Sequence, residues 1–119
     1  MGEVGIFTGR NPDTIRGADV AFISKDRLAQ CSGKHGFLEA APELIVEVLS
    51  LSVRPRKVRQ KLAEYFSIGV KRVWVAELAL RGVREHRSVD EFRVFELQDR
   101  LEGEDFLPGF SIRVQELFR

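Results

Sequence analysis

Several residue types that define common protein classes are scarce in this sequence. Its 119 residues include a single cysteine, Cys31, and two histidines. One cysteine excludes an internal disulfide, and the spacing of the cysteine and the histidines matches no zinc-binding pattern. A chain without disulfides is typical of a reducing compartment, so we expect a cytoplasmic protein.

Long apolar runs are missing as well. The apolar segments fall far short of the about 20 residues that a helix needs to cross a bilayer. Residues 1–5 have neither the basic nor the apolar region of a signal peptide. No glycine-rich phosphate loop is present, and Ser50 and Ser52 lie on no nucleophile elbow. We therefore expect no membrane association, and neither a nucleotide triphosphatase nor a serine hydrolase.

The sequence also lacks a large excess of charge of one sign. The 19 basic and 18 acidic residues leave a formal net charge of +1, which excludes a histone-like polycation. Nucleic-acid binding would therefore need a local basic patch. The 44% of apolar residues is enough for a packed core, and the length predicts one domain, residues 1–119.

Strand-like and helix-like stretches alternate along the chain. The one convincing helix is expected over residues 54–68, before Gly69. There an apolar stripe recurs at helical spacing, formed by Val58, Leu62, Tyr65 and Phe66. Turns or connections are expected at 9–17 and 78–91, and short helical turns at 26–30 and 114–119. The strands are expected at residues 4–8, 18–24, 43–50, 70–77 and 92–97.

This pattern predicts an α/β (α+β) fold with a mixed sheet and one covering helix. Such sheets usually have both faces covered, and one helix covers only one of them. An apolar face left open would exceed what monomers tolerate. We therefore expect a second copy of the chain to cover it, as a homodimer.

Glu47 is the most informative single residue, because it interrupts an otherwise apolar strand. A buried carboxylate is costly without a partner, so Glu47 is either a salt-bridged structural residue or part of a site. Asp19 opens the preceding strand, and pairing of the two strands would bring it close to Glu47. Two neighbouring carboxylates suit Mg²⁺, with Mn²⁺ as the alternative.

The start of the helix is strongly basic. Five positive charges fall within eight residues, although cations at a helix N-terminus oppose the helix dipole. Either they contact phosphate groups or they form a solvated face, and the two readings are equally good for Arg56 and Arg59. Lys61 differs, because it flanks the apolar stripe and its head can reach Asp19 and Glu47. The basic residues are Arg54, Arg56, Lys57, Arg59 and Lys61.

Five segments carry a resemblance to a known family, namely residues 18–22 (ADVAF), 42–50 (PELIVEVLS), 61–65 (KLAEY), 69–75 (GVKRVWV) and 108–110 (PGF). Taken together, they resemble the Uma-type restriction endonucleases, a family of the PD-(D/E)XK nuclease superfamily. The resemblance covers almost the whole chain and implies a restriction-endonuclease-like fold. Relatives carry an N-terminal helical region before the part that matches residue 2 onward, so we expect the domain to be N-terminally shortened.

The resemblance also implies catalytic roles. Asp19 and Glu47 match the two acidic positions of the superfamily motif, with Glu43 as a further metal ligand. Leu49 stands where the motif usually has lysine, and Lys61 on the helix matches the position that replaces it in the family. The implied activity is Mg²⁺-dependent phosphodiester hydrolysis of DNA. The alternative is a catalytically degenerate module that acts in DNA binding or dimerisation.

Overall fold

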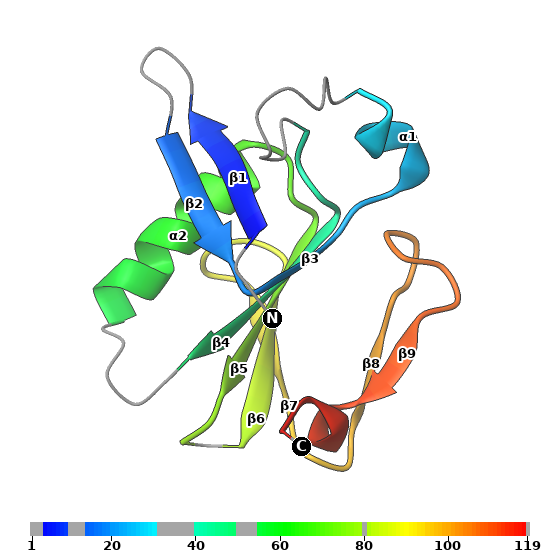
Figure 1. Cartoon of the computed structure of the whole chain (residues 1–119). Coiled ribbons are helices and arrows are strands. Elements are labelled where there is room, and N and C mark those ends of the chain that lie inside the picture. The colour runs from blue at the N-terminus through cyan, green and yellow to red at the C-terminus, as the bar shows by residue number, and fades with distance from the viewer. Residues whose placement is uncertain (1–3, 10–13, 31–39, 50–54, 80, 119) are drawn as a thin grey trace.

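The computed structural model describes residues 4–9, 14–30, 40–49, 55–79 and 81–118 (Figure 1). Its centre is a five-stranded mixed sheet in the order β3-β4-β5-β6-β7. The central strands β4 and β5 run parallel, and every other neighbouring pair is antiparallel. The strands are β3 (Val20–Phe22), β4 (Leu44–Leu49), β5 (Arg72–Glu77), β6 (Gly82–His86) and β7 (Phe92–Phe95).

Helix α2 (Pro55–Ser67) forms the crossover between the parallel strands β4 and β5. The buried residues of α2 are Val58, Leu62 and Tyr65, which belong to the apolar stripe predicted from the sequence. They pack on β4 and β5 in one hydrophobic cluster. The chain leaves the helix at Gly69, whose φ of 104° suits glycine. This cluster consists of Ile45, Val58, Leu62, Tyr65, Val70, Val73 and Val75.

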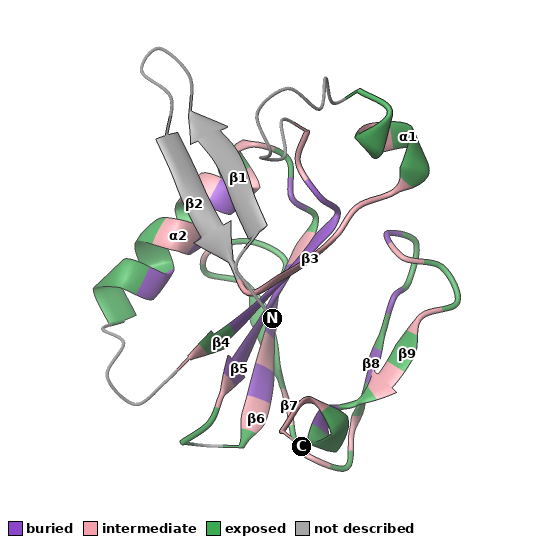
Figure 2. Ribbon diagram, in the orientation of Figure 1, coloured by how far each residue is buried: buried purple, intermediate pink, exposed green. Residues whose placement is uncertain are grey.

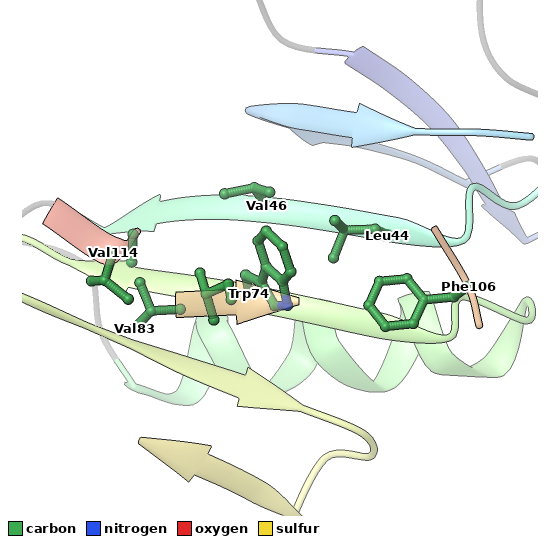
Figure 3. Close-up of a cluster of buried hydrophobic side chains, with 8 residues drawn as sticks. Leu44, Val46, Trp74, Val83, Phe106 and Val114 are labelled. Atoms are coloured by element: carbon green, nitrogen blue, oxygen red, sulfur yellow. The ribbon is translucent and has the colours of Figure 1, made fainter. Parts of the chain in front are cut away.

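The opposite face of the sheet is covered by the end of the chain. Figure 1 shows α2 and the hairpin of β8 (Arg100–Glu102) and β9 (Ser111–Arg113) on opposite sides of the sheet, with the 3-10 helix η1 (Val114–Phe118) after the hairpin. A second cluster joins the sheet to this C-terminal layer (Figure 3). Its buried members are Leu44, Val46, Trp74, Ala76, Val83, Leu101, Phe106 and Val114.

The expectation of an uncovered sheet face is therefore wrong. Leu101 and Val114 are fully buried, so the C-terminal layer is part of the core (Figure 2). The sequence pattern hid this layer because β8 and β9 have three residues each, too few to show an alternating pattern. The physical argument for a homodimer that covers the face falls with it.

Two further strands lie where connections were predicted. β6 occupies part of the predicted connection 78–91. β2 (Thr14–Ala18) falls mostly within the predicted turn 9–17, and it pairs with β1 (Val4–Gly9). β6 escaped detection because its buried face carries Glu85, which accepts a 2.6 Å hydrogen bond from Trp74 Nε1. A polar residue with a buried partner breaks the apolar pattern without breaking the strand.

The remaining predicted elements are present with shifted bounds. The predicted strand 18–24 is interrupted at Asp19, between β2 and β3. The predicted turn of helix at 26–30 is α1 (Lys25–Leu28), and the predicted terminal turn is η1. Within the described part of the chain, no helix has the length and apolar character that a membrane span requires.

Candidate active site

The site begins with two carboxylates, Asp19 directly before β3 and Glu47 on the neighbouring strand β4. In the antiparallel pairing of β3 with β4, Val20 lies opposite Val46, so Asp19 stands beside Glu47. Asp19 Oδ2 accepts a 2.7 Å hydrogen bond from the backbone N–H of Val48. The predicted approach of Asp19 to Glu47 is thus present in the structure.

Two side chains of helix α2 contact the Glu47 carboxylate. Strand alternation turns its side chain to the same face as Ile45, which packs on α2. The Tyr65 hydroxyl donates a 2.7 Å hydrogen bond to Glu47 Oε1, and Lys61 Nζ lies 3.0 Å from the same oxygen. Because Lys61 and Tyr65 are four residues apart, one helix face delivers both groups.

Burial raises the pKa of Glu47 above the usual glutamate value. The Tyr65 hydrogen bond and the Lys61 charge pull the pKa down, while the negative charge of Asp19 raises it further. Burial outweighs the two stabilising partners, because only 8% of the residue is exposed. Burial therefore destabilises the charged form of the carboxylate by more than Tyr65 and Lys61 stabilise it.

A cavity of about 280 Å³ opens over these groups. Asp19, Glu47, Lys57, Lys61 and Tyr65 line it together with apolar residues of β4, β5 and α2. The structure therefore brings three of the predicted catalytic and metal-binding residues into one pocket, and adds Lys57 from the predicted DNA-binding set.

The other basic residues of the helix differ in their surroundings. Arg56 is exposed, whereas Arg59 makes two hydrogen bonds to the carboxylate of Asp90, at 2.6 and 3.1 Å. Asp90 thus raises the pKa of Arg59, and Arg59 lowers that of Asp90. Arg54 lies outside the described residues. Of the four basic residues of the set that the structure describes, Lys57 and Lys61 are at the pocket.

Glu43 is not brought to this pocket. It precedes β4, four residues before Glu47, which at about 3.3 Å per strand residue is about 13 Å away. Its Oε1 accepts a 2.8 Å hydrogen bond from the backbone N–H of Ser24, and Arg27 Nε lies 3.5 Å from Oε2. Burial raises the pKa of Glu43, but these partners outweigh burial and lower it. In this position Glu43 anchors the start of α1.

The donor set suits a magnesium ion completed by water and substrate. Among the described residues, no group of three or more histidine, cysteine, aspartate or glutamate side chains converges on one point. Mg²⁺ is commonly held by one or two carboxylates, its other ligands being waters and substrate phosphate oxygens. Asp19 and Glu47 meet that requirement.

Sequence reasoning missed the role of Tyr65. It counted the residue as part of the apolar stripe, and its ring is indeed fully buried in the first cluster. A buried tyrosine hydroxyl nevertheless needs a hydrogen-bond partner. The available signal was the four-residue spacing from Lys61, which places both side chains over the same strand residue.

The fold and the site together define a class of protein. It is an α+β domain with a mixed sheet, in which two carboxylates at neighbouring strands lie beneath a lysine of the covering helix. Residues 1–115 match the family model Uma2, described as "Putative restriction endonuclease". The chain belongs to the Uma2 family.

A solved structure is similar to this chain along nearly its full length. It is described as a putative nuclease belonging to DUF820 from Anabaena variabilis, and it matches with a TM-score of 0.79 at 19% identity. The match covers 99% of this chain and 66% of that one. The likeness establishes a shared nuclease-like fold. No curated protein matches the chain.

Proposed function

We propose that this domain hydrolyses DNA phosphodiester bonds with Mg²⁺ as the cofactor and Mn²⁺ as a substitute, as a restriction-type endonuclease. The observation that carries the proposal is the convergence of Asp19, Glu47 and Lys61 on one pocket. Membership of the Uma2 family supports the same activity. A salt-bridged structural glutamate alone would not account for Asp19 at the same opening.

Each residue has a separate task in this proposal. Asp19 and Glu47 hold the cation, which supplies Lewis acidity toward the phosphodiester when bound. The Lys61 ammonium group, already positioned by Glu47, stabilises negative charge that develops on the phosphoryl oxygens. Lys57 at the pocket and exposed Arg56 contact flanking phosphates of the DNA.

Two parts of the proposal extend beyond the pocket. A cytoplasmic location gives the enzyme access to DNA and fits the single cysteine. A homodimer would place two sites in one particle, so that both DNA strands could be cut. Because the C-terminal layer covers the sheet, the cutting of both strands is now the sole basis for proposing a homodimer. Light scattering tests it, since the chain mass is 13.6 kDa.

The activity is tested with supercoiled plasmid DNA and Mg²⁺. We expect wild-type protein to nick or linearise the plasmid, and chelation of the metal to stop it. Glu47→Gln and Lys61→Met should each lose most of the activity, whereas Glu116→Gln, which changes an exposed acid of η1 on the opposite side of the sheet from α2, should keep it. Metal-independent DNA binding without cleavage by the wild type would instead support the degenerate module.

A further inference from the structure

Two contacts that α2 makes with the Glu47 carboxylate end on the same oxygen. The Tyr65 hydroxyl donates to Oε1 at 2.7 Å, and Lys61 Nζ lies 3.0 Å from it. A carboxylate fixed at one oxygen by two donors cannot rotate freely about its last torsion. Its second oxygen, Oε2, is then held in one direction.

Tyr65 is itself held rigidly. The residue is fully buried among the apolar side chains of the first cluster, and it lies in the last turn of α2. Its backbone carbonyl accepts hydrogen bonds from the N–H groups of Ile68 and Val70. A buried ring on an anchored turn has little rotational freedom, so its hydroxyl marks a fixed point above β4.

The lysine on the same oxygen is less constrained. The Lys61 side chain is 32% exposed and ends on a flexible stem, whereas the Tyr65 ring is enclosed. During the proposed reaction Lys61 also has to face the phosphoryl group. The rigid group that keeps the carboxylate in place throughout is therefore the tyrosine.

We propose that Tyr65 is a positioning residue, whose hydroxyl holds Glu47 Oε1 so that Oε2 faces the pocket and the divalent cation. This inference rests on the proposed function. Residues that hydrogen-bond to metal ligands orient them, and their loss typically lowers metal affinity about 10- to 100-fold. Tyr65 acts in this way on Glu47 and touches neither metal nor DNA.

The test is Mn²⁺ binding by calorimetry to wild type, Tyr65→Phe and Glu47→Gln. Phenylalanine keeps the buried ring and removes only the hydroxyl. We expect Tyr65→Phe to bind Mn²⁺ about 10- to 100-fold more weakly, and to recover cleavage at raised Mn²⁺ with little change in kcat. Ser67→Ala is the matched control, since it removes a hydroxyl from the same helix that donates to the Glu64 carbonyl.

The outcomes separate the two proposals. Wild-type affinity in Tyr65→Phe with binding lost in Glu47→Gln overturns the role of Tyr65 and leaves the metal site standing. Wild-type affinity in Glu47→Gln overturns the metal site and the inference with it.

A second measurement works on the wild type and does not depend on the variant folding. Tyr65 is the only tyrosine, so protein labelled with ¹³C at the tyrosine Cζ, the carbon that bears the hydroxyl, gives one tyrosine signal. Saturating Mg²⁺ should shift it, because charge drawn from Glu47 weakens the hydrogen bond. A signal that stays in place while Mg²⁺ binds overturns the inference.

Discussion

Arg59 of α2 and Asp90 of the β6–β7 connection form a two-pronged ion pair, with N–O distances of 2.6 and 3.1 Å. Both side chains are largely exposed, at 61% and 76%, so the pair adds little to stability. Its consequence is electrostatic, because it neutralises one charge of the basic helix. Lys57, two residues earlier on α2, lies at the pocket.

The first prediction is that Lys57 and Arg59 contribute unequally to DNA binding. Each phosphate contact adds about 0.9 to the slope of log K against log salt concentration. We expect Lys57→Gln to reduce the slope by about 0.9 and Arg59→Gln to reduce it by clearly less. Asp90→Asn, which releases Arg59, should strengthen binding. Fluorescence anisotropy across a salt series measures all three variants.

Equal losses of slope in Lys57→Gln and Arg59→Gln would contradict this account. They would mean that DNA displaces Asp90 from Arg59 at no cost, and that the whole helix face contacts phosphate.

The elements with a strong local pattern could be predicted from the sequence. β4 and α2 were found because apolar residues follow the strand and helix periods there. The pairing that sets Asp19 beside Glu47 followed from the same pattern, since two consecutive strands commonly pair. Lys61 was singled out by its place beside the apolar stripe, and the resemblance to the family supplied its catalytic role.

What could not be predicted depends on contacts between distant residues. Glu85 looks like a loop residue until Trp74 Nε1 is known to donate to it. By strand alternation Glu43 falls on the same face as Glu47, and only the distant partners Ser24 and Arg27 show that Glu43 is engaged elsewhere. The C-terminal layer depends on β8 and β9, and each of these strands is too short to show a period.

The second prediction concerns Gly103, which lies at a tight turn of the C-terminal layer. A Cβ added at Gly103 would lie 1.8 Å from the Leu107 carbonyl oxygen, so the backbone would have to move. We expect Gly103→Ala to lower the free energy of unfolding by about 3 kcal/mol or more. Urea denaturation measures the change.

Gly69→Ala is the matched control, because a Cβ there meets nothing within 4 Å and only the φ of 104° is unfavourable. It should cost about 1–2 kcal/mol. If Gly103→Ala proves no more destabilising than Gly69→Ala, the tight turn at Gly103 is not as described.

The third prediction follows from His86, which is 2% exposed and lies against the Phe92 ring. Burial lowers its pKa below 6.5, the nearby Arg84 charge lowers it further, and the Ser88 carbonyl and Glu77 oppose both without reversing the shift. The unfolded chain then binds a proton that the folded chain does not. Stability should therefore fall as pH drops below 6.5, by at most about 1.4 kcal/mol per pH unit from this group.

Thermal unfolding at pH values from about 5 to 8 measures this dependence. His86→Gln should flatten the curve below pH 6.5, where the unfolded histidine titrates. The NMR titration of His86 should show a pKa below that value. A His86 signal that titrates at or above 6.5 would show that the ring is not buried as described.

The central claim is that Asp19 and Glu47 form a divalent cation site, and calorimetric titration with Mg²⁺ and Mn²⁺ tests it most directly. The set is wild type, Glu47→Gln, Asp19→Asn and Glu43→Gln, with circular dichroism to establish that each is folded. The account predicts binding by wild type and by Glu43→Gln, and its loss in Glu47→Gln and Asp19→Asn. Binding that survives Glu47→Gln, or a folded wild type that binds neither ion, would contradict it.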